Sequence, residues 1–229
     1  DILASRGPEE RQAIQDRFGA KHAKFAQTLR SALKSELSGK ELTAALEERW
    51  PEIAGTDTWP DRVLKDRADA MIRRLAGYVA GVRAGEIAVE QPFAVQIGRA
   101  LVAGSADRVE ITEGAARIVD LKTGQPVSKQ DAEDHAQLAM YQLAAENGGF
   151  DGVSSAEGAA LVFVGGTTVS ASERPQPPID VDKETARLAD AVETMARGTF
   201  EAVTNSRCDA CPVRRACPAW PSGRQVTDG

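Results

Sequence analysis

The most constraining feature of this sequence is a pair of strand-like segments, 104–112 and 115–123, separated only by Glu113-Gly114. A two-residue turn at this point would join them as an antiparallel hairpin and fix its register. Asp107 lies six positions before the turn and Asp120 six positions after it, so the two carboxylates are predicted to lie directly opposite each other. Lys122 shares the face of Asp120, because side chains alternate along a strand.

Carboxylates that face each other destabilise a sheet unless positive charge lies between them. Mg²⁺ is typically held by one or two carboxylates together with substrate phosphate, so a divalent cation is the natural resolution. Lys122 would then orient a water molecule or neutralise charge developing on a phosphate. The alternative is an ordinary exposed hairpin whose Asp and Lys side chains face solvent, since surface charge pairs of this kind are common.

Polar residues from other segments favour the first interpretation. Glu90 lies just before the preceding strand-like segment, and Gln137 and Tyr141 lie one helical turn apart on a face offset from the alanine-rich one. Convergence of polar groups from separate elements on one place is unusual for a purely structural surface.

Hydrophobic spacing predicts the order of the elements along the chain. The expected helices are 9–50 with a break at Ser38-Gly39 and an end at Pro51, then 61–83, 131–147 and 184–203; the expected strands are one around 93–97, then 104–112, 115–123 and 159–164. Residues 53–59 are predicted to be a loop and residues 172–178 a Pro-rich connection. This order indicates an α/β domain with a helical N-terminal part.

Composition narrows the class of protein. The chain has 229 residues, 42% of them hydrophobic, which excludes a disordered chain. Its apolar runs are far shorter than the roughly 20 residues needed to span a bilayer, so no membrane association is expected. Three cysteines cannot form a closed disulfide set, which favours a cytoplasmic protein. The net charge of −6 argues against a general polyanion binder but leaves a local basic groove open.

Several of these segments together resemble a known family. Asp107 in Gly104-Ser105-Ala106-Asp107-Arg108, the run Asp120-Leu121-Lys122-Thr123-Gly124 and the helical Gln137-Leu138-Ala139-Met140-Tyr141 are similar to the RecB-like branch of the PD-(D/E)xK nuclease superfamily. The resemblance implies a restriction-endonuclease-like fold, in which helices flank a central mixed β-sheet. It also implies a Mg²⁺- or Mn²⁺-dependent deoxyribonuclease.

The same resemblance assigns roles to individual residues. Asp107 and Asp120 would be metal ligands with the Leu121 carbonyl nearby, and Lys122 would be the catalytic lysine. Gln137 and Tyr141 would be a supporting pair on a helix near the site, facing the substrate strand. Arg108, Arg117 and Lys129 are candidate contacts to the DNA backbone.

The upstream part departs from the family pattern. RecB-like nucleases usually carry a metal-binding His on an N-terminal helix, and here Arg30 occupies the position that fits this frame best. His22 is the nearby substitute and a candidate ligand, although a lone His on a helix is more often a surface or packing residue. His135, just before Gln137, is expected to be an exposed helix residue.

The C-terminal tail carries all three cysteines within ten residues, in the array Cys208-x2-Cys211-x5-Cys217. Thiolates so close together can converge on one soft metal centre, and the alternative is a chance grouping of free thiols. Structural zinc and iron–sulfur clusters both prefer four ligands, whereas this chain offers three cysteines. The array resembles the C-terminal part of the 4Fe-4S site of AddB- and AdnB-type helicase–nuclease subunits, whose fourth cysteine lies well upstream.

These observations lead to a specific functional expectation. We expect a nuclease domain of a bacterial helicase–nuclease that repairs double-strand breaks and acts in recombination, with single-stranded DNA, a helicase portion and a partner subunit as its partners. The predicted divisions are a helical part over 1–85, the nuclease core over 86–204 and the cysteine tail over 205–229. The missing initiator Met and fourth cysteine favour a C-terminal fragment of a longer protein.

Two other functions remain open on the sequence. The first is a nuclease-like fold that has lost cleavage and serves in DNA-end binding or subunit docking, which would explain Arg30 and the incomplete cysteine set. The second is a stand-alone exonuclease of the CRISPR-associated kind, which would require a native start and a complete cluster. The absence of a Walker A pattern places any helicase motor outside this sequence.

Overall fold

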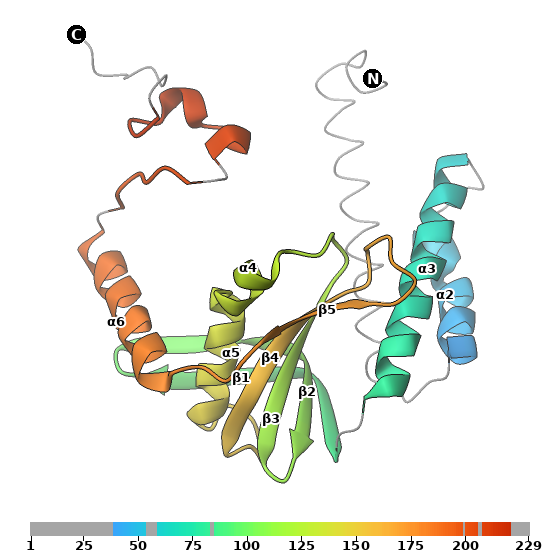
Figure 1. Cartoon of the computed structure of the whole chain (residues 1–229), viewed down its shortest axis with the longest axis horizontal. Helices are drawn as coiled ribbons and strands as arrows, with labels where there is room; N and C mark the ends of the chain where they lie inside the picture. Colours follow the sequence, from blue (N-terminus) through green and yellow to red (C-terminus); the bar gives the residue numbers. More distant parts are fainter. Residues whose placement is uncertain (1–38, 54–58, 83–84, 199, 206–207, 221–229) are drawn as a thin grey trace. The chain divides into compact units, whose positions relative to one another are not determined.

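The computed structural model describes residues 39–53, 59–82, 85–198, 200–205 and 208–220. It divides into two compact units, the first ending at Thr185 and the second beginning at Ala186. The first unit contains the sheet and its helices, and the second contains most of α6 and the cysteine tail (Figure 1). The boundaries at 85 and 204 that the sequence indicates stay predictions.

A five-stranded mixed sheet forms the centre of the first unit. Its strands are β1 (Glu86–Ile97), β2 (Ala100–Thr112), β3 (Ala115–Lys122), β4 (Ser155–Phe163) and β5 (Ser172–Gln176). They lie in the order β1-β2-β3-β4-β5, and all neighbours are antiparallel except β3 and β4, which are parallel. A mixed sheet flanked by helices confirms the expected restriction-endonuclease-like α/β fold.

The β2–β3 hairpin has the register that the sequence predicts. Arg108 pairs with Val119, and the pairing continues to Thr112 and Ala115 beside the turn. Glu113 and Gly114 adopt φ values of +52° and +84°, as a two-residue turn with the strand twist requires. Asp107 and Asp120 are therefore the next opposed positions along the two strands.

Helices cover the two faces of this sheet. α2 (Gly39–Ile53) and α3 (Trp59–Gly81) pack on the face that carries Val119 and Leu121, in a cluster of buried apolar side chains. α5 (Ala136–Glu146) contacts β3 and β4 through its buried residues. Because side chains alternate along β3, Asp120 lies on the face toward α5, opposite to that of Val119 and Leu121.

The end of β3 is held against the connection that follows β4. Val164 N donates to Lys122 O (2.9 Å), and a Cβ at Gly165 would overlap the Thr123 carbonyl. Arg74 of α3 donates to the carbonyls of Val164 (2.9 Å) and Thr168 (2.6 Å). These contacts fix the backbone at Lys122 and directly after it.

The prediction of one helix over 131–147 is wrong, because this segment forms two helices. α4 (Lys129–Glu133) has Ser128 as its N-cap, whose Oγ accepts from Asp131 N (3.1 Å), and α5 begins after its own N-cap His135. The carbonyls exposed by the break accept hydrogen bonds from the amide of Gln176. The alanine-rich spacing continues through the break, so periodicity alone does not reveal it.

Other boundaries also differ from the sequence-based expectation. The segment expected to be a Pro-rich connection begins with β5, in which Pro175 pairs with Ala160 at the sheet edge, where a strand tolerates proline. α2 continues through Pro51 to Ile53. Residues 54–58, the interior of the loop expected over 53–59, lie outside the described residues. The last helix, α6, runs over Val181–Arg197, starting and ending earlier than predicted.

Candidate active site

Asp120 is at the centre of the candidate site. It lies on β3, between β2 and β4, and is 3% exposed. Its Oδ1 accepts hydrogen bonds from Gln137 Nε2 (2.9 Å) and Tyr141 OH (3.4 Å). Its Oδ2 is buried and lies 2.6 Å from Lys122 Nζ, but accepts no well-directed hydrogen bond from the described residues. Oδ2 is thus close to positive charge yet incompletely satisfied.

Asp107 is anchored to the strand that carries Asp120. Its Oδ2 accepts a hydrogen bond from Leu121 N (2.8 Å), which joins the predicted aspartate on β2 to the backbone between Asp120 and Lys122. The structure therefore brings Asp107, Asp120, Leu121 and Lys122 together at one end of the β2–β3 hairpin. Their roles in metal binding and catalysis stay predictions.

Gln137 and Tyr141 reach this group from α5. Gln137 Nε2 donates to Tyr141 OH (2.7 Å), and Gln137 Oε1 lies 3.4 Å from Lys122 Nζ. Tyr141 OH also contacts Ser105 O (3.2 Å) on β2. The pair thus links α5, β2 and β3 around a single carboxylate oxygen.

The environment of Tyr141 keeps its phenol neutral. Burial, followed by the charge of Asp120, raises the pKa of Tyr141 to about 12. Its ring meets Phe93 of β1 edge-on at 5.8 Å, which fixes the ring orientation. Tyr141 is therefore a rigid hydrogen-bonding group at neutral pH rather than a proton acceptor.

The donor set fits a hard divalent cation. The two opposed carboxylates supply oxygen ligands of the kind that Mg²⁺ and Mn²⁺ prefer, and the incompletely satisfied Oδ2 of Asp120 is suited to a cation. Within the described residues, no group of three or more His, Cys, Asp and Glu side chains is arranged to hold a metal ion. Two carboxylates with ligands from water and substrate are sufficient for Mg²⁺.

Glu90 lies within β1 rather than just before it, in line with the two aspartates. The β1–β2 pairing passes from Val89 with Arg108 to Gln91 with Ala106, so Glu90 lies opposite Asp107. Its φ of +48° is unusual for a residue other than glycine, and the pairing is interrupted there. Glu90, Asp107 and Asp120 occupy one row across three strands.

His22 and Arg30 both lie outside the described residues. His135 immediately precedes α5 as its N-cap and is half-buried, so the expectation of an exposed helix residue is wrong.

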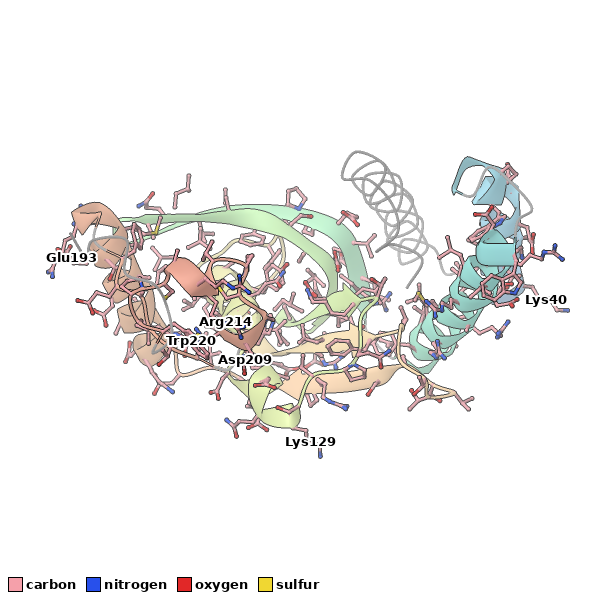
Figure 2. All side chains as sticks on the ribbon, turned by 90° about the horizontal axis from the view of Figure 1, so that it is seen from above. Lys40, Lys129, Glu193, Asp209, Arg214 and Trp220 are labelled. Carbon is pink, nitrogen blue, oxygen red and sulfur yellow. The ribbon has the colours of Figure 1, made fainter. Side chains whose placement is uncertain are left out.

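The candidate DNA contacts differ in accessibility. Arg108 is 1% exposed and pairs with Glu110 (2.8 Å), so the prediction that it contacts a phosphate is wrong. Arg117 forms ion pairs with Glu110 (2.9 Å) and Glu173 (2.5 Å), so its charge is already compensated. Lys129 is exposed at the start of α4 (Figure 2) and stays a candidate.

The cysteine tail is a series of tight turns. Cys211 N donates to Cys208 O, Arg214 N to Cys211 O, and Cys217 N to Arg214 O, at 3.2–3.3 Å. Asn205 N lies 3.2 Å from Cys208 Sγ, and Arg214 lies over the ring of Trp220 at 5.5 Å (Figure 2). All three thiols are free and partly exposed, and they remain candidate cluster ligands.

Comparison with known proteins identifies the family. A model of the PD-(D/E)XK nuclease superfamily matches residues 5–218, nearly the whole chain. The chain belongs to the PD-(D/E)XK nuclease superfamily. A PD-(D/E)XK chain implies a nuclease that hydrolyses phosphodiester bonds, which agrees with the grouping of Asp107, Asp120 and Lys122.

Other comparisons add less. A solved structure described as "Crystal structure of SSO0001" is 17% identical and aligns over 86% of this chain and 94% of that chain, with a TM-score of 0.39. No curated protein matches the chain significantly. None of the described helices is long and apolar enough to cross a membrane.

Proposed function

We propose that this chain is a Mg²⁺- or Mn²⁺-dependent deoxyribonuclease domain that cuts single-stranded DNA. The observation that carries the proposal is the arrangement around Asp120. Asp107 lies opposite it on β2, and Lys122 Nζ lies 2.6 Å from its Oδ2. Gln137 and Tyr141 donate hydrogen bonds to its Oδ1. Two carboxylates and a lysine at one strand end suit phosphoryl chemistry.

Asp107 and Asp120 would hold the metal ion. When bound, the metal would polarise the scissile phosphate and lower the pKa of a coordinated water. Lys122 stabilises the negative charge that develops on the phosphate or positions the attacking water. Gln137 and Tyr141 orient Asp120, and the neutral phenol of Tyr141 keeps its proton throughout.

The direct test compares Asp120→Asn with a matched control, Asp151→Asn, which removes an exposed carboxylate in the loop after α5. Cleavage of end-labelled single strands with Mn²⁺ should fall by about 100-fold or more in Asp120→Asn, since a charged ligand is lost. Asp151→Asn should cut like the wild type. Equal cleavage by wild type and Asp120→Asn in clean preparations would refute the assignment.

Single-strand preference has a separate measurement. Single-stranded, blunt duplex and gapped DNA of the same sequence are compared at equal concentration of ends. The proposal expects the highest kcat/KM on the single strand. Faster cleavage of the blunt duplex would show that the substrate class is wrong while leaving the nuclease assignment in place.

A helicase–nuclease context is proposed on the likeness of the cysteine tail to AddB- and AdnB-type subunits. In this proposal Cys208, Cys211 and Cys217 supply three ligands of a 4Fe-4S cluster, and a residue outside this sequence supplies the fourth. Iron and acid-labile sulfide are measured after anaerobic purification of the natural full-length protein. A full-length protein without iron, or without a motor domain, would refute this context.

The competing function is a module that binds DNA ends or docks a subunit without cutting. It is favoured by the described residues, among which no group of three or more His, Cys, Asp and Glu side chains is arranged to hold a metal ion. Calorimetric titration with Mn²⁺ separates the two functions. Binding that is lost in Asp107→Ala supports a working site, whereas absence of binding in both proteins supports the module.

A further inference from the structure

Two buried glutamines, one on α5 and one on β5, form a hydrogen-bond network outside the group around Asp120. Gln142 on α5 is 0% exposed and Gln176 at the end of β5 is 4% exposed. Full burial of a side-chain amide is costly unless all of its donors and acceptors are paired. Both side chains meet this requirement through the contacts described next.

Gln176 holds the break between the two helices. Its Nε2 contacts the carbonyls of Ala132 (3.3 Å), Glu133 (2.8 Å) and His135 (3.1 Å). These carbonyls lie at the C-terminal end of α4 and immediately before α5, and those of Ala132 and His135 also accept from His135 N (3.2 Å) and Ala139 N (3.1 Å). One side chain from β5 thus contacts both helices at the break between them.

Gln142 joins this anchor to the middle of α5. Its Nε2 donates to Gln176 Oε1 (3.0 Å) and Pro177 O (3.2 Å), and its Oε1 accepts from Ile179 N (3.2 Å). Every polar atom of the Gln142 side chain is thereby engaged. Loss of one member would leave its buried partners unpaired, which costs free energy. The fully paired network is therefore rigid.

The two anchors flank the site residues of α5. Gln137 follows the bonded His135 by two residues, and Tyr141 directly precedes Gln142. The contacts of this helix with Asp120 have little tolerance: a 1 Å displacement would take the 2.9 Å bond from Gln137 beyond hydrogen-bond range.

We propose that Gln142 and Gln176 are positioning residues of the nuclease site, which hold α5 so that Gln137 and Tyr141 engage Asp120. This inference rests on the proposed function for its catalytic consequence. It assigns to β5, an edge strand far from Asp107 in the sheet order, a part in setting the geometry of the site.

The test is Gln176→Met, which keeps much of the side-chain volume and removes every polar group. The control is Leu143→Ala, which creates a cavity on the same buried helix without touching the network. Both are measured at a temperature at which thermal unfolding curves show them folded. We expect Gln176→Met to lower kcat about tenfold with KM changed less than twofold, because the reacting groups are misplaced while binding is retained.

The control decides between positioning and mere stability. Leu143→Ala should lower Tm at least as much as Gln176→Met and keep kcat within about twofold. An unchanged kcat in Gln176→Met, or equal losses of kcat in both variants, would overturn the inference. Gln142→Met should behave as Gln176→Met.

Mn²⁺ calorimetry provides a readout independent of cleavage. We expect Gln176→Met to bind Mn²⁺ several-fold more weakly than Leu143→Ala, because Asp120 loses its orientation. If the wild type binds Mn²⁺ but does not cut DNA, the proposed function fails while this comparison still tests the positioning. Equal Mn²⁺ affinity in the two variants would count against positioning.

Discussion

Lys122 lies beside the buried carboxylate of Asp120, whose negative charge it neutralises. The buried Oδ2 of Asp120 has Lys122 Nζ as a close cationic neighbour, at 2.6 Å, and a divalent cation would use the same oxygen. Two cations cannot both lie against one oxygen without strong repulsion. In the proposed function, metal binding would therefore compete with the Asp120–Lys122 ion pair for this atom.

Removal of the lysine should separate metal binding from catalysis. In Lys122→Met, Mn²⁺ should bind about three- to tenfold more tightly, because the competing charge is gone, while DNA cleavage is lost. Calorimetry and a cleavage assay measure the two effects. Lys129→Met, which changes an exposed lysine on α4, should leave both unchanged. Weaker Mn²⁺ binding in Lys122→Met would contradict the competition.

The tyrosine of α3 predicts a loss of stability at alkaline pH. Burial, followed by the charge of Glu110, raises the pKa of Tyr78 to about 12, from an ordinary value of 10.0. The folded state thus favours the neutral phenol, and its contribution to stability is complete below pH 10 and lost as the pH rises toward 12. The urea unfolding midpoint should fall across this interval, and less steeply in Tyr78→Phe. Identical profiles for both proteins would show that Tyr78 is not the group responsible.

The positions of the two aspartates were predictable because a short turn leaves one register. Glu113-Gly114 fixes which residues of β2 and β3 oppose each other, and it places Asp107 and Asp120 together without further information. The importance of Gln176 was not predictable. Its partners are backbone carbonyls at a helix break, and neither the break nor their orientation has a signature in the local sequence.

The stability of the β2–β3 hairpin should depend on the two residues of its turn. Asn at the first turn position tolerates a positive φ better than Glu, so Glu113→Asn should raise the free energy of unfolding by about 0.5 kcal/mol. Gly114→Ala should lower it by about 1–2 kcal/mol, since φ is +84° and a Cβ would lie 3.1 Å from Ser154 Oγ. Urea unfolding measures both changes. An opposite order would mean that another turn type forms in solution.

Elements at the margins of the sheet were harder to predict than its centre. β5 has the sequence Ser-Glu-Arg-Pro-Gln, which contains no β-branched or aromatic residue, and its strand character comes from pairing with the apolar β4. β4 was recognisable because its buried residues form a nearly continuous apolar run. Tertiary pairing, rather than local propensity, therefore determines the last strand.

For the molecule as a whole, the distribution of charge limits how strongly this chain binds DNA by itself. The net charge is −6, Arg108 is buried, and Arg117 is paired with two carboxylates. Arg108 and Arg117 are therefore not available to phosphates, and each cation that does contact a phosphate adds about −0.7 to the salt slope of single-strand binding. We expect a plot of log K against log salt, measured by fluorescence anisotropy with Asp120→Asn in the absence of divalent metal, to have a slope shallower than about −2. A slope of about −4 or steeper would require additional basic contacts elsewhere in the chain.

The continuity of β1, β2 and β3 has a consequence for how the protein folds. These strands are consecutive in the chain and pair through short turns, whereas β4 joins them only after the α4–α5 crossover. Local pairing of this kind favours early formation, so the two like charges of Asp107 and Asp120 would meet before the domain is complete. Mn²⁺ present during refolding should therefore speed the folding step itself, besides slowing unfolding. Stopped-flow refolding of Asp107→Asn, in which the repulsion is absent, should show no such acceleration.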